Sequence, residues 1–162
     1  MSHNLEIERK FLIKMPTNLP AGRVQAISQT YLYSERGLSC RVRKIVENGQ
    51  TVYIFTEKEK LSDLTRIERE RELTRAEYED YLKQADVNLD SIHKTRHKIP
   101  LGPYVWEVDI FPFWHKQAIL EVELPAEDAA FALPPWAEVI REVTRDKAYT
   151  NHAMARTIPA EE

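Results

Sequence analysis

The chain has 162 residues, of which 43% are hydrophobic, enough for one globular domain with a sizeable core. Charged residues make up 30% of the chain, but 26 acids nearly balance 23 Lys and Arg, which argues against a general nucleic-acid-binding protein with a basic surface. Cys40 is the only cysteine, which excludes an internal disulfide, and no segment approaches the roughly 18 apolar residues of a membrane span, so we expect a cytoplasmic protein without a membrane partner.

Alternating polar and apolar residues recur along most of the chain and predict about eight strands. The segments lie near residues 5–13, 27–33, 39–47, 51–59, 66–73, 92–99, 104–111 and 118–124. Asn48-Gly49 connects the third and fourth segments, and residues 100–103 connect the sixth and seventh. Asn-Gly supplies the positive φ angles of a tight hairpin, so we expect neighbouring strands to be antiparallel.

Three helical segments interrupt or follow these strands. Thr74 and Glu77 have the spacing of a capping box and begin a helix that runs to about Ala85. Residues 125–133 predict a short helix, and residues 146–156 predict a last one without internal Pro or Gly. No linker or repeat interrupts the pattern, which predicts one α+β domain over residues 1–162.

The first predicted strand places its charges on one side. Glu6, Glu8 and Lys10 share one face because successive side chains of a strand point to opposite faces. The other face carries Ile7 and Phe11. For one strand alone, the solvated face of an antiparallel sheet explains this pattern.

Six further segments carry a charged strip of the same kind. The strips are Arg41 and Arg43; Thr56 and Lys58; Arg66, Glu68, Glu70 and Glu72; Lys94, Arg96 and Lys98; Glu107 and Asp109; and Glu121 and Glu123. Because both signs recur opposite largely apolar strips, we expect the charged faces to enclose a water-filled cavity. A closed or nearly closed antiparallel sheet with helices packed outside would produce it.

A polyphosphate with divalent cations would satisfy both sets of charges. Clustered carboxylates hold Mg²⁺ or Mn²⁺ through hard oxygen ligands, while Lys and Arg neutralise phosphate oxygens. The chain contains no GxxxxGK[ST] motif, so a P-loop is absent.

The motifs together resemble the CYTH domains, or triphosphate tunnel metalloenzymes. The resemblance rests on ExExK (6–10), QTYL (29–32), RVR (41–43), TEK (56–58), RIERE (66–70), KTR (94–96), WEVD (106–109), EVE (121–123) and EVTRDKAYTN (142–151). It spans nearly the whole chain and implies an eight-stranded antiparallel, barrel-like tunnel. The tunnel of such proteins binds a triphosphate with one or two divalent metals.

The resemblance also implies a role for individual residues. The residues that would bind the phosphates are Lys10, Arg41, Arg43, Lys58, Lys94 and Arg96. The metal that engages the triphosphate would be held by Asp109, Glu121 and Glu123. Glu6 and Glu8 would hold a second metal and position the attacking water, with Glu8 or a metal-bound hydroxide as the base.

Four residues have weaker assignments from the same resemblance. Tyr31 is a further catalytic candidate, and Glu68 and Glu70 would orient the arginines. Lys147 lies in the last helical segment, which would close one end of the tunnel.

The leading hypothesis is a metal-dependent triphosphatase that acts on inorganic tripolyphosphate. Thiamine triphosphatase, nucleoside triphosphatase and adenylate cyclase activities of the same family are alternatives. A non-catalytic polyphosphate-binding module is another, and a sandwich with solvated outer strips is the third reading. The expected partner is a small-molecule triphosphate, without dedicated nucleic-acid binding, and a homodimer is a possible assembly.

Overall fold

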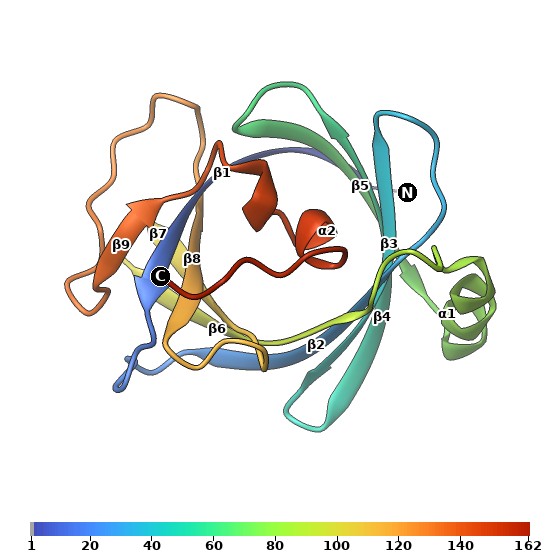
Figure 1. Cartoon of the computed structure of the whole chain (residues 1–162), viewed down its shortest axis with the longest axis horizontal. Coiled ribbons are helices and arrows are strands. Elements are labelled where there is room, and N and C mark those ends of the chain that lie inside the picture. The colour runs from blue at the N-terminus through green and yellow to red at the C-terminus, as the bar shows by residue number, and fades with distance from the viewer. Residues whose placement is uncertain (1) are drawn as a thin grey trace.

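The computed structural model describes residues 2–162, which contain nine strands. These are β1 (Ser2–Lys14), β2 (Arg23–Tyr31), β3 (Leu38–Glu47), β4 (Gln50–Lys60), β5 (Thr65–Leu73), β6 (Ile92–Leu101), β7 (Tyr104–Ile110), β8 (Gln117–Glu123) and β9 (Val139–Glu142). Eight of them form an antiparallel sheet in the order β5-β4-β3-β2-β6-β7-β8-β1, and β1 pairs again with β5 (Figure 1). The sheet is therefore a closed barrel, as the charged strips predicted.

Strand β1 closes the barrel because it has different partners along its two edges. Residues 2–7 pair with β5, whereas residues 8–14 pair with β8. Beyond the β5 pairing, residues 11–13 pair with β9 across a register shift. The short β9 was not predicted from the sequence. It pairs with β1 beyond the point where the pairing with β5 ends.

The predicted hairpins are confirmed. Asn48 and Gly49 both have positive φ angles, 50° and 76°, between β3 and β4. Gly102, with φ of 60°, lies in the turn between β6 and β7. In both places the backbone adopts the left-handed region that a tight hairpin requires.

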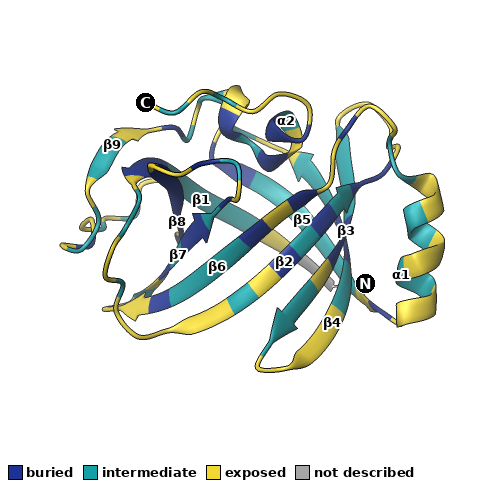
Figure 2. Cartoon of the chain, turned by 60° about the horizontal axis from the view of Figure 1, so that its bottom comes forward, coloured by how far each residue is buried: buried dark blue, intermediate teal, exposed yellow. Residues whose placement is uncertain are grey.

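Helix α1 (Arg75–Tyr81), followed by the 3₁₀ helix η1 (Leu82–Gln84), packs outside the barrel, as predicted (Figure 2). The capping box is present, because Thr74 Oγ1 accepts from the Glu77 amide and Glu77 Oε1 accepts from the Thr74 amide. The outer face under the helix is apolar. The cluster comprises Leu32, Val42, Phe55 and Leu73, packed against Tyr53, Tyr78, Tyr81 and Leu82.

The predicted helix at 125–133 is wrong, since this segment forms turns and extended chain without a helix. Tertiary contacts outweigh its local helix propensity. The Phe131 ring meets Phe11 edge-on at 6.1 Å and Trp106 at 5.9 Å between centroids. Tyr104 donates a hydrogen bond to the Ala130 carbonyl at 2.7 Å. This loop, rather than a helix, covers the outer apolar face of β1, β7 and β8.

The last helical segment is shorter than predicted, and it lies across one end of the barrel, as the resemblance implied, instead of packing outside (Figure 1). It consists of the 3₁₀ helix η2 (Lys147–Tyr149) and the single turn α2 (Asn151–Met154). Thr150 interrupts it with an extended backbone, and its side chain caps α2. Figure 1 shows α2 and the chain that follows it across one end of the barrel. We call residues 147–154 the cap.

Within residues 2–162, every helix falls short of the length and apolar character needed to span a membrane.

Candidate active site

The interior of the barrel is a polar cavity of about 570 Å³. All seven predicted charged strips contribute to its wall, which confirms that these faces point inward. Thirteen of the predicted site residues line it: Glu6, Glu8, Lys10, Tyr31, Arg41, Arg43, Lys58, Glu68, Glu70, Lys94, Arg96, Glu121 and Glu123. Asp109 and Lys147 are outside this lining.

The acidic part of the wall is built by β1 and β8. Their register places Glu8 opposite Glu123, and Lys10 opposite Glu121. Partial burial raises the pKa of Glu123, and the charges of Glu6, Glu8 and Glu107 raise it further. The carboxylates in this region therefore repel one another, which a bound cation would relieve.

Ion pairs connect the acidic wall to the basic residues beside it. Lys58 Nζ lies 3.0 Å from Glu6 Oε1 and 3.8 Å from a Glu68 carboxylate oxygen. Arg66 lies 4.0 Å from Glu8. The residues implied for metal and phosphate binding are thus neighbours in one site.

The basic wall on β3 contains two guanidinium groups, those of the half-buried Arg41 and the buried Arg43. Their Nε atoms are buried and have no hydrogen-bond partner within residues 2–162. Burial lowers the pKa of Arg43 to about 9, and the neighbouring Arg41 and Arg96 add to the effect. Guanidinium groups with an Nε donor left unpaired in a confined site suit an anion with several oxygens, such as a phosphate chain.

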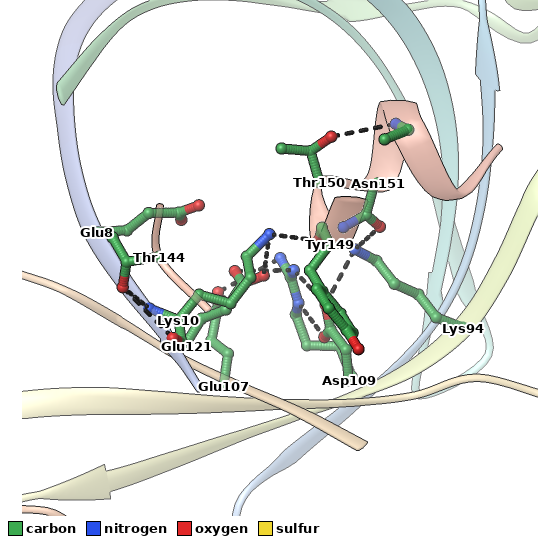
Figure 3. Close-up of polar contacts among 12 residues, drawn as sticks. Glu8, Lys10, Lys94, Glu107, Asp109, Glu121, Thr144, Tyr149, Thr150 and Asn151 are labelled. Carbon is green, nitrogen blue, oxygen red and sulfur yellow. Dashed lines mark hydrogen bonds and ion pairs between the residues drawn. The ribbon is translucent and has the colours of Figure 1, made fainter. Parts of the chain in front are cut away.

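Asp109 is fully buried and binds two basic residues, of which Figure 3 labels Lys94. Arg96 donates to both of its oxygens, each at 2.8 Å, and Lys94 Nζ lies 3.0 Å from Oδ2. Burial opposes the charge, but Arg96 and Lys94 outweigh it and hold the pKa of Asp109 well below its usual range. Burial also lowers the pKa of Lys94 to about 7, against the attraction of Asp109. Asp109 therefore lies behind the wall and supports it.

Comparison with known proteins agrees with this geometry, although no protein-family model matches the chain. The inorganic triphosphatase of Acetivibrio thermocellus is 30% identical over 152 residues, 93% of each chain. The inorganic triphosphatase of Nitrosomonas europaea is 33% identical over 159 residues, 95% of this chain and 99% of the relative. A solved inorganic triphosphatase structure superposes with a TM-score of 0.58 at 30% identity, covering 96% of this chain and 97% of that one.

The chain belongs to the CYTH family of triphosphate tunnel enzymes. Triphosphatases of this family generally depend on a divalent metal. Within residues 2–162, no three His, Cys, Asp or Glu side chains converge to hold a metal unaided. Mg²⁺, however, usually needs only one or two carboxylates beside water and substrate phosphates. The crowded Glu8 and Glu123 are hard oxygen donors of that kind, so the residues of the tunnel fit such an ion.

The tunnel also contains residues that the family motifs did not assign. Arg66, Lys98 and Glu107 line it, and the alternation of their strands had placed them on the inner faces. Thr150, Asn151 and His152 of the cap line it as well. The motif EVTRDKAYTN contains Thr150 and Asn151 but gave them no role, because their position in the tunnel depends on how the chain returns to the barrel. The exposed Lys147 lies in the cap, but its side chain is outside the lining.

Proposed function

We propose that this tunnel hydrolyses the terminal phosphate of inorganic tripolyphosphate with Mg²⁺ or Mn²⁺, as one domain over residues 1–162 acting in the cytoplasm. The observation that carries the proposal is the division of the wall. Within residues 2–162, the Nε donors of Arg41 and Arg43 on β3 have no hydrogen-bond partner, and the crowded Glu123 lies on β8, which is opposite β3 in the order of the closed sheet. Water would attack the terminal phosphorus, giving pyrophosphate and orthophosphate.

Six basic side chains would bind and neutralise the phosphate chain: Lys10, Arg41, Arg43, Lys58, Lys94 and Arg96. Most are already near carboxylates, for example Lys10 with Glu121 at 3.4 Å and Arg43 with Glu70 at 3.7 Å. Such pairs hold the cations in place before the substrate arrives. Glu68 and Glu70 would serve this orienting role, and Tyr31 would contribute its hydroxyl at the capped end.

The carboxylates would divide between holding the metal and handling the water. Glu121 and Glu123 would hold the ion that engages the triphosphate. Asp109, which the family motif also implies as a ligand, lies behind the wall and would act on the site through Arg96 and Lys94. When bound, the ion would polarise phosphoryl oxygens and acidify water. Glu6 and Glu8 would hold a second ion and orient the attacking water, with Glu8 placed to accept its proton.

The test is phosphate release from tripolyphosphate, thiamine triphosphate, ATP and pyrophosphate, each with Mg²⁺, Mn²⁺ or Ca²⁺. We expect tripolyphosphate to turn over fastest, Glu8→Gln to abolish most activity, and EDTA to abolish it all. Glu138→Gln is the matched control, because Glu138 is an exposed partner of Lys14 outside the tunnel. Binding of tripolyphosphate without turnover of any substrate would indicate a binding module instead, and absence of both would contradict the proposed site.

A further inference from the structure

Two buried amides, Gln29 and Asn151, meet at the capped end of the tunnel. Gln29 Nε2 donates to Asn151 Oδ1 and to the Tyr31 hydroxyl oxygen, each at 3.0 Å. Lys94 Nζ donates to the same Asn151 oxygen at 3.0 Å (Figure 3). Gln29 is fully buried and Asn151 is 9% exposed. The Asn151 side-chain oxygen of the cap therefore accepts from both Lys94 in the tunnel wall and the buried Gln29 of β2.

This arrangement restricts how the Lys94 ammonium can point. An ammonium group has three donors. Asp109 Oδ2 and Asn151 Oδ1 each lie 3.0 Å from Lys94 Nζ and occupy two of them. Lys94 lines the cavity, so the third donor is left for a ligand there. Without Asn151, the ammonium would have only Asp109 as a fixed acceptor at this side.

The cap is held to a second wall lysine in a similar way. Lys10 Nζ donates to the Tyr149 carbonyl at 3.2 Å. Residues Lys10 and Lys94 thus both contact the cap through oxygen acceptors, one from the backbone and one from a side chain. Only the Asn151 contact depends on the identity of a side chain.

Stability alone does not account for Gln29. Its Oε1 atom is buried and has no hydrogen-bond partner within residues 2–162. A buried acceptor left unpaired costs free energy, which an apolar side chain of similar size would avoid. The amide donors of Gln29 are the part that the site uses, because they orient Asn151 and the Tyr31 hydroxyl.

We propose that Gln29 and Asn151 are positioning residues that hold the Lys94 ammonium and the Tyr31 hydroxyl in fixed orientations, so that the cap helps to set the affinity for triphosphate. The inference rests on the proposed function for its ligand. It assigns the two amides no contact with the reacting atoms.

The test is tripolyphosphate binding by calorimetry in EDTA, together with steady-state kinetics in Mg²⁺. We expect Asn151→Leu to raise Kd and KM roughly 10- to 100-fold, as for loss of a hydrogen bond to a charged group, with kcat changed less than about threefold. Gln29→Leu should act in the same direction, and the double variant should show less than the product of the two effects, because both act through one network.

Ala153→Gly is the matched control, since it weakens α2 without removing a polar side chain. We expect it to leave Kd nearly unchanged. An equal rise in Kd for Ala153→Gly would show that cap stability, rather than Asn151, sets affinity and would overturn the inference. If Asn151→Leu does not fold, Asn151→Ala, which keeps a strong helix former in α2, replaces it.

The two proposals fail in different ways. If wild type binds tripolyphosphate but hydrolyses nothing, the proposed function is wrong while the effect of Asn151 on Kd still decides the inference. If wild type hydrolyses tripolyphosphate and the Asn151 variants bind it as wild type does, only the inference is wrong. Absence of wild-type binding would overturn both.

Discussion

Glu8 of β1 lies directly opposite Glu123 of β8, so two acids of the same charge face each other across an antiparallel pair. Like charges in this relationship destabilise a sheet. The neighbouring pair differs, because Lys10 opposes Glu121 and lies 3.4 Å from it. Two residues further along the same strands, a repulsive contact is therefore replaced by an attractive one. Removing the charge of Glu123 and removing the charge of Glu121 should consequently have opposite effects on stability.

Glu123→Gln should stabilise the metal-free protein and lower its activity. Partial burial and the charges of Glu6, Glu8 and Glu107 raise the pKa of Glu123, so its ionised form is disfavoured in the folded state. The gain should be present at pH 7 and fade as the pH falls towards the ordinary Glu pKa of about 4.3, where wild-type Glu123 is protonated. Urea unfolding in EDTA measures it, while phosphate release should fall at least about tenfold.

Glu121→Gln is the matched comparison on the same strand. It removes the partner of Lys10, so it should lower the stability of the metal-free protein while also lowering activity. A loss of stability in both variants would contradict the repulsion inferred around Glu123.

The barrel was predictable because its signal is local. Seven of the predicted strands alternate charged and apolar residues, and a charged face cannot pack in an apolar core. Arg66 and Glu107 follow the same alternation, so their places on the inner wall were implied even though the motifs that contain them gave them no role. Asn48 and Gly49 marked a hairpin by backbone chemistry alone.

The parts that the sequence did not predict depend on distant contacts. Strand β9 pairs with three residues of β1, too few to leave a pattern. The loop at 125–133 contains residues that favour a helix, but Phe131 packs on Phe11 and Trp106 instead. Asn151 reaches Lys94, 57 positions away in sequence, only because the cap folds back over the barrel.

Asp109→Asn should destabilise the metal-free protein by about 3–5 kcal/mol at pH 7, because it leaves Arg96 and Lys94 buried beside an uncharged group. The pKa of Asp109 is held well below its usual range, so its contribution is present above the unfolded value of about 3.9 and is lost as the pH falls below it. Urea unfolding from pH 7 to pH 3 should show the gap between wild type and variant narrowing. A gap that stays constant with pH would contradict this account of Asp109.

Phe131→Ala should lower the free energy of unfolding by about 2 kcal/mol, somewhat less than for a fully buried phenylalanine. Phe131 is partly buried and packs on Phe11, on Trp106 and under Arg9, whose guanidinium carbon lies 4.5 Å from the ring centroid. These contacts are on the outer face, so KM for tripolyphosphate should not change. Chemical denaturation and kinetics on one preparation test both parts, and a raised KM would show that the loop also shapes the tunnel.

Arg43→Met should stabilise the free protein and reduce the further stabilisation that tripolyphosphate gives. Arg43 is 7% exposed, and burial beside Arg41 and Arg96 lowers its pKa to about 9. At pH 7 the group is charged in both states, so the folded state bears the cost of that buried charge, and stability from this group rises only as the pH passes upward through about 9. Replacing it with an apolar side chain should add about 1–2 kcal/mol at pH 7.

Stabilisation by bound tripolyphosphate should change in the opposite direction from the stability of the free protein, which makes the test specific. Tripolyphosphate at 100 times its Kd stabilises the wild type by about 2.7 kcal/mol, or roughly 5–11 °C in Tm for a chain of this size. If Arg43→Met raises Kd about 100-fold, the gain at the same concentration falls to about 0.4 kcal/mol. Arg75→Met, on the exposed face of α1, should keep the wild-type shift. Thermal unfolding in EDTA with and without tripolyphosphate separates the cases, and a full shift in Arg43→Met would remove Arg43 from the phosphate-binding residues.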